Sequence, residues 1–134
     1  MKPISLVAVV FCVISCSPTL PTYDVKITGN SIKVPVSGFD NSNINIVSDE
    51  HGPFDILLVK DSPLAFRSLY LKCTFDAKAL DTTPEYIVCP VCGSAYDFDG
   101  SATKGPAESP LVKFPTELNP DQTIVTINIQ SLGL

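Results

Sequence analysis

The sequence has no tryptophan, one histidine and few basic residues. The single imidazole, His51, leaves almost no histidine for metal ligation, and no nucleophile, base and cleft can be recognised together as a catalytic set. Nine Lys and Arg stand against 14 Asp and Glu, and the net charge is −5. A negative chain of this kind does not attract a phosphate backbone. We therefore expect no nucleic-acid partner and no enzymatic activity.

Long amphipathic helices are also missing, and short alternating runs of apolar and polar residues take their place. Residues 23–28, 32–36 and 125–130 alternate with the period of two that is typical of a strand buried on one face. Residues 29–30 predict a turn, so the first two runs are expected to form a hairpin. Pro35 cannot donate a hydrogen bond to a neighbouring strand, which favours an edge position for the second run.

Two further stretches indicate how the strands are buried. Residues 56–59 form a continuous apolar run, which predicts a strand covered on both faces. Leu69, Leu71 and Cys73 share one face of another extended run, so this strand is expected to bring Cys73 inward at its end. Together the short strands predict an all-β domain, an antiparallel sandwich or barrel of small sheets.

The first residues indicate export. Lys2 precedes an apolar run, residues 4–14, that is too short to span a bilayer, which predicts a signal peptide over residues 1–15. The run ends in a small residue followed by Cys16, and this ending resembles the bacterial lipoprotein signal. The resemblance implies that Cys16 receives the lipid. The alternative is an ordinary secretory signal with an incidental cysteine.

Lipidation of Cys16 would make the membrane a partner of the chain. Several acyl chains on one cysteine anchor a protein stably, because each buried methylene contributes about 0.8 kcal/mol. Residues 16–22 contain two prolines and would form a short tether for a domain spanning residues 23–134. Ser17 follows the cysteine, so nothing marks retention in an inner membrane. The expected location is the cell envelope, at the outer membrane if the organism has one.

Residues 89–107 carry two of the remaining cysteines in a pattern that can be identified. Cys-Pro-Val-Cys-Gly-Ser-Ala-Tyr-Asp, followed by Gly100 and Gly-Pro-Ala, resembles the second cluster-binding loop of Rieske iron–sulfur domains. The resemblance implies three small antiparallel sheets with two loops at one tip, and it places a strand at residues 111–114. It also implies that seven residues shape the loop: Pro90, Gly93, Ser94, Tyr96, Gly100, Gly105 and Pro106. The three glycines among them are expected to form turns with positive φ. The Tyr96 hydroxyl is expected either to point toward the site or to cap the core.

The ligand set of that family is incomplete in this chain. In a Rieske site two thiolates bind one iron and two imidazoles bind the other. The family's first loop reads Cys-x-His, and here Cys73-Thr74-Phe75 occupies its position. Phe75 has no donor atom, and Cys92 replaces the second histidine. The resemblance therefore implies ancestry, and we expect a degenerate domain without the Rieske cluster, its old site filled by Phe75.

Three thiols leave several alternatives open. A variant [2Fe–2S] cluster held by Cys73, Cys89 and Cys92 requires a fourth ligand, for which Asp76 and His51 are available. A zinc site built on the Cys89-x2-Cys92 spacing requires a fourth ligand as well. In an oxidising compartment any two of the three cysteines could form a disulfide, and bonds from Cys89 to Cys73 or to Cys92 are examples.

Two functions of different classes correspond to these alternatives. One is an electron-transfer protein that passes single electrons from a variant [2Fe–2S] cluster to a partner. The other is an interaction module without a cluster, which keeps the β scaffold and offers its tip loops to an unidentified protein partner.

Overall fold

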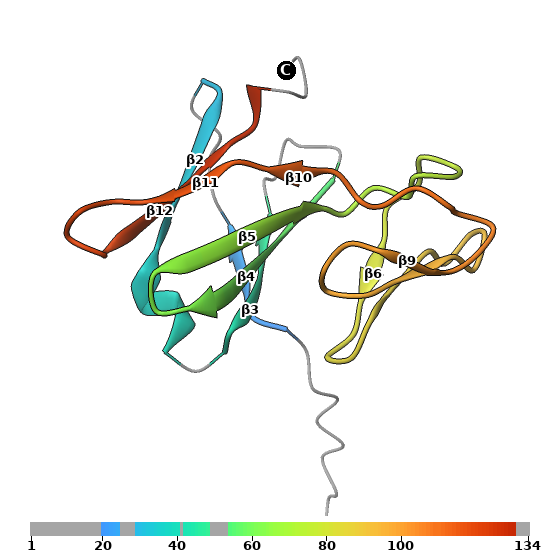
Figure 1. Ribbon diagram of the computed structural model, residues 1–134, viewed down its shortest axis with the longest axis horizontal. Helices are drawn as coiled ribbons and strands as arrows, with labels where there is room; N and C mark the ends of the chain where they lie inside the picture. The colour runs from blue at the N-terminus through green and yellow to red at the C-terminus, as the bar shows by residue number, and fades with distance from the viewer. Residues whose placement is uncertain (1–19, 25–28, 41, 49–53, 131–134) are drawn as a thin grey trace, which may run out of the picture.

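The protein is described by a computed structural model, in which residues 20–24, 29–40, 42–48 and 54–130 are placed (Figure 1). The predicted signal peptide, Cys16 and His51 lie outside the described residues. The described part is all-β, as predicted, with one short 3₁₀ helix, η1 (Val36–Phe39). No helix in these ranges is long and apolar enough to cross a membrane.

The strands form three small sheets. The five-stranded sheet has the order β1 (Thr22–Asp24), β3 (Ile44–Ser48), β4 (Ile56–Ser62), β5 (Ala65–Tyr70), β10 (Lys113–Phe114). The three-stranded sheet has the order β11 (Thr116–Leu118), β12 (Ile124–Asn128), β2 (Ser31–Pro35). The four-stranded sheet has the order β6 (Asp81–Thr82), β7 (Ile87–Val88), β8 (Ala95–Tyr96), β9 (Ala102–Lys104), and Figure 1 shows it beside the other two.

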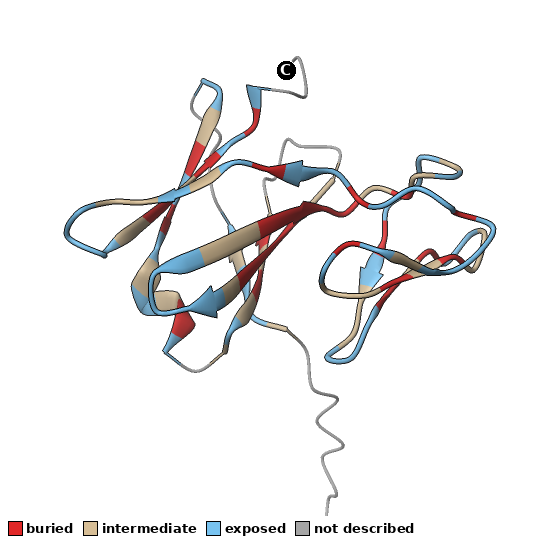
Figure 2. Cartoon of the chain, in the orientation of Figure 1, coloured by how far each residue is buried: buried red, intermediate tan, exposed pale blue. Residues whose placement is uncertain are grey.

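The five-stranded sheet lies between two hydrophobic cores, and β4 contributes to both. Ile56 and Leu58 belong to the core shared with the three-stranded sheet. Leu57 and Val59 point to the opposite face and belong to the core shared with the four-stranded sheet. All four are buried, which confirms the prediction of a strand covered on both faces, and Figure 2 shows the burial continuing into β5. The first core makes a two-sheet sandwich, and no sheet of the described residues closes on itself.

The predicted hairpin would pair residues 25–28 with β2, and residues 25–28 lie outside the described residues. The first strand, β1, pairs in parallel with β3, so that Tyr23 lies opposite Val47. The second, β2, pairs with β12, so that Val34 lies opposite Val125. Alternation fixes which face of a strand is buried, but burial in a common core decides which strand becomes its neighbour. Among the described strands β2 ends its sheet, which agrees with the edge position expected from Pro35.

The loop glycines behave in two ways. Gly93 and Gly100 have φ values of 79° and 87°, which confirms the turns with positive φ predicted for them. Gly105 does not have a positive φ, so the turn with positive φ predicted for it is wrong. Gly105 instead precedes a cis peptide bond to Pro106. Gly100 is also crowded, because a Cβ atom there would lie 2.9 Å from Cδ2 of Leu69.

Gly100→Ala is therefore expected to destabilise the fold for two reasons, backbone strain and overlap with Leu69. We expect the free energy of unfolding to fall by about 2–4 kcal/mol, measured by urea denaturation. Gly29→Ala is the matched control, because Gly29 has a φ of 66° and a Cβ atom added there would have no neighbour within 4 Å. The control should lose only about 1 kcal/mol, and equal losses would show that the contact with Leu69 is unimportant.

Candidate metal centre

The segment after β5 turns back on itself and carries Cys73 at its start. The Cys73 N–H donates to the Lys78 carbonyl at 2.8 Å, and the Ala77 N–H donates to the Cys73 carbonyl at 3.0 Å. Ala77 has a φ of 59°, and a bridge between Lys72 and Ala79 closes the base of the loop. We call residues 73–78 the first knuckle. Cys73 is buried at its start, as predicted.

Residues 89–94, between β7 and β8, repeat this backbone arrangement and are called the second knuckle. The Cys89 N–H donates to the Ser94 carbonyl at 2.8 Å, and the Gly93 N–H donates to the Cys89 carbonyl at 3.0 Å. Gly93 has the positive φ that Ala77 has in the first knuckle. Val88 pairs with Ala95 at the base. The two knuckles are thus equivalent, position by position.

Equivalent positions of the two knuckles supply the donor atoms. The first position is a buried thiol, Cys73 or Cys89, and the fourth is a half-buried donor, Asp76 or Cys92. One ligand atom from each of these four side chains lies within 4.8 Å of the other three. This group of residues can hold a metal ion. Of the two candidates for a fourth ligand, the structure brings Asp76 to the thiols, whereas His51 lies outside the described residues.

Two of the contacts among the donors cross from one knuckle to the other. Sγ of Cys73 lies 3.7 Å from Sγ of Cys92, and Sγ of Cys89 lies 3.5 Å from Oδ1 of Asp76. A tetrahedral ion with metal–sulfur bonds of about 2.3 Å and metal–oxygen bonds of about 2.0 Å needs edges of about 3.8 Å and 3.5 Å. These two of the six donor–donor distances match those of one tetrahedral ion, and the other four are at most 4.8 Å.

The same spacing does not fit a Rieske cluster. Ligands on the two different irons of a [2Fe–2S] cluster are held further apart than the ligands of a single ion, because the irons themselves are separated. The four donor atoms here are all within 4.8 Å of one another, and none of them is an imidazole. The residues present therefore match neither the geometry nor the ligand types of that cluster.

The expectation that Phe75 fills the old site is wrong. The Phe75 side chain is 60% exposed, and Val91, at the equivalent third position of the second knuckle, is 64% exposed. The third residue of each knuckle is therefore turned toward solvent, while the first and fourth face the donor group. The space between the knuckles is lined by thiols and a carboxylate instead of apolar carbon.

The surroundings of the donors favour different protonation states. Burial raises the pKa of the Cys89 thiol to about 11, so this group is a neutral donor to Asp76 in the metal-free chain. A hydrogen bond with the Ser94 hydroxyl, 3.1 Å away, lowers the pKa of the Cys92 thiol. Burial raises the pKa of the Asp76 carboxyl, but hydrogen bonds from Cys73, the Lys78 N–H and the other thiols outweigh it and leave that pKa lowered. Cys73, Cys89 and Cys92 are free thiols.

Two hydroxyl groups, those of Tyr96 and Ser94, hold the backbone around the donor atoms by hydrogen bonds. The buried Tyr96 hydroxyl lies 3.5 Å from Sγ of Cys73 and accepts a hydrogen bond from the Thr74 N–H at 3.1 Å. Of the two roles expected for Tyr96, the hydroxyl therefore does point toward the site, and the ring packs in the core as well. The Ser94 hydroxyl accepts a hydrogen bond from the Ala107 N–H at 2.9 Å, which fastens the Gly-Pro-Ala segment to the second knuckle. Pro90 occupies the exposed second position of that knuckle.

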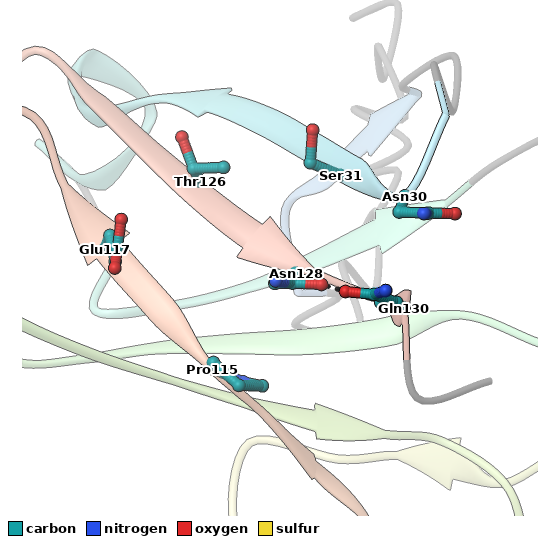
Figure 3. A pocket seen from close by; sticks show the side chains of 7 residues that line it. All are labelled: Asn30, Ser31, Pro115, Glu117, Thr126, Asn128 and Gln130. Carbon is teal, nitrogen blue, oxygen red and sulfur yellow. Dashed lines mark hydrogen bonds between the residues drawn. The ribbon is translucent and has the colours of Figure 1, made fainter. Parts of the chain in front are cut away.

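A separate hollow of about 220 Å³ lies on the three-stranded sheet (Figure 3). Its lining includes Glu117, Thr126 and Asn128, and Figure 3 shows these side chains spread along β11 and β12 with no thiol among them. Oδ1 of Asn128 already accepts a hydrogen bond from the Gln130 N–H at 3.0 Å. The converging donors are in the knuckles, which makes the knuckle site the better candidate for function.

Comparisons with protein-family models and with curated proteins find no match for this chain.

Proposed function

We propose that this chain is a lipid-anchored envelope protein whose Rieske-like domain binds one zinc ion in place of the Rieske cluster. The ligands are Cys73, Asp76, Cys89 and Cys92. The observation that carries the proposal is the pair of equivalent knuckles, whose four donor atoms lie within 4.8 Å of one another. The sequence of residues 89–107 and the three small sheets support the Rieske-like ancestry, and the apolar run before Cys16 supports the lipid anchor.

Zinc is the ion that suits this donor set. It accepts thiolate and carboxylate ligands, prefers tetrahedral coordination and needs no redox partner. With four protein ligands the site is closed, as in structural zinc sites, so we assign it no catalytic step. The ion would join the two knuckles and fix the tip of the domain. Phe75 and Val91, both exposed, would then be presented to a protein partner on a rigid support.

The test is a metal analysis of the full chain, purified in detergent without oxygen. We expect one zinc per chain, no acid-labile sulfide and no visible absorption. Replacement of zinc by Co²⁺ should give the ligand-field bands of a tetrahedral thiolate site. Two irons and two labile sulfides per chain would overturn the proposal in favour of a variant [2Fe–2S] electron carrier. A metal-free chain that does not bind added zinc would also overturn it.

Zinc binding should strengthen as the pH rises. The ion binds the Cys89 thiolate, but the raised pKa of about 11 keeps this thiol protonated near neutrality. Protons therefore compete with zinc, and below pH 11 the apparent affinity should rise at least about tenfold per pH unit. Competition with a chromogenic chelator between pH 6 and 8 measures the slope. In Cys89→Ser the slope should be smaller by about one proton, and a flat profile in the unaltered chain would contradict the expectation.

A further inference from the structure

We propose that the zinc site is also a reversible oxidation site, at which a peroxide joins Cys73 to Cys92 in a disulfide and thereby releases the ion. The inference rests on the proposed metal centre and adds its regulation. The disulfide would cross from one knuckle to the other. The sequence alone leaves any two of the three cysteines free to pair, and the structure favours this pair.

The geometry selects this pair of thiols. The Sγ atoms of Cys73 and Cys92 are in contact at 3.7 Å, and a disulfide bond of about 2.05 Å requires only a small further approach. The third thiol, Cys89, is engaged elsewhere, because it contacts both carboxylate oxygens of Asp76 at 3.5 and 3.6 Å. Cys89 and Cys92 also belong to one knuckle, whose hydrogen bonds hold that loop in its present form.

The exposure of the two sulfurs suggests the order of events. Cys92 is half-buried, so a small oxidant can reach it, whereas Cys73 is only 2% exposed. Hydrogen peroxide transfers one oxygen atom to the Cys92 thiolate, and sulfenic acid and hydroxide form as the O–O bond breaks. The Cys73 thiolate then attacks this sulfur, the S–S bond forms, and the S–O bond breaks with loss of a second hydroxide. Two thiolates have supplied two electrons, and one peroxide has become two hydroxides.

Loss of two thiolates leaves the ion without half of its ligands. Cys89 and Asp76 remain, and two ligands do not make the four-coordinate site that zinc requires. The ion leaves as Zn²⁺ with its charge unchanged. A dithiol can later reduce the Cys73–Cys92 disulfide by exchange, which restores both ligands and allows zinc to bind again.

The experiment treats the zinc-loaded full chain with one equivalent of hydrogen peroxide. Released zinc is measured with a chromogenic chelator, free thiols are alkylated, and the disulfide is mapped by mass spectrometry. We expect one zinc released per disulfide, the bond between Cys73 and Cys92, and alkylated Cys89. Addition of a dithiol should restore one zinc per chain. A bond that includes Cys89, or sulfinic acid at Cys92 without any disulfide, would overturn the inference.

Two controls separate this inference from the proposed function. Cys89→Ser keeps the reacting pair, so it should still form the Cys73–Cys92 bond when oxidised without zinc. Cys73→Ser removes the partner, so its Cys92 should stop at sulfenic acid, which a dimedone probe detects. If the unaltered chain bound no zinc, the metal centre would fail. Mapping of the oxidised metal-free chain would even then show whether the two thiols pair.

Discussion

Cys73→Ser is expected to lower the affinity of the chain for zinc by about 100- to 1000-fold. Structural zinc sites in peptides contribute about 10–16 kcal/mol at neutral pH, which is about 2.5–4 kcal/mol for each of four ligands. Every 1.4 kcal/mol corresponds to about a factor of ten. Cys73 is buried between the knuckles and contacts Cys92, so water cannot easily take its place. Isothermal titration in competition with a chelator measures the change.

Two further variants show whether the loss belongs to the site. Asp76→Ala should cost less than Cys73→Ser, because Asp76 is half-buried and a water molecule can bind the ion in its position. Glu108→Gln removes an exposed carboxylate that is not among the four donors, and it should leave the affinity unchanged. Equal affinities of Cys73→Ser and the unaltered chain would exclude the four-ligand site.

Leu69→Ala is expected to give the largest loss of fold stability among the single substitutions considered. Leu69 is fully buried on β5, where it lies opposite Leu57 and packs in the core that joins the five-stranded sheet to the four-stranded sheet. The loop at Gly100 lies directly over its side chain. Removing a buried leucine side chain costs about 2–5 kcal/mol, part of it from the cavity that remains. The free energy of unfolding by urea should fall by this amount.

Leu64 provides the matched control for the same substitution. It lies in the turn between β4 and β5 and is 62% exposed. Leu64→Ala should change the free energy of unfolding by less than about 0.5 kcal/mol, as is usual for surface positions. If both leucine variants unfolded at the same urea concentration, the second core would not link the two sheets energetically.

Much of the scaffold can be predicted from the sequence because burial leaves a local pattern. The alternation around Val125 and Ile127 corresponds to β12, where both residues are buried. The apolar run at residues 56–59 corresponds to a strand with a core on each face. Partner choice leaves no such pattern: β2 pairs with β12, some ninety residues further along the chain, which no local turn signal could indicate. The pairings that β1 and β2 make in the described residues were therefore not predicted.

The fourth candidate ligand, Asp76, could have been identified from spacing. Alignment with the Rieske loop directs attention to Phe75, two residues after Cys73, where the family has its histidine. The spacing Cys73-x2-Asp76 instead repeats Cys89-x2-Cys92, and this repeat marks the two knuckles. The convergence of the two knuckles could not be predicted, because it depends on how the end of β5 packs against β7 and β8. Only the folded chain brings Asp76 to Cys89.

The equivalence of the knuckles has a consequence for the evolution of such a site. Each loop is shaped by main-chain hydrogen bonds at its first, fifth and sixth positions, and the fourth residue contributes only its side chain to the group of donors. An inherited exchange at that fourth position can therefore alter which ion is preferred while the loop keeps its form.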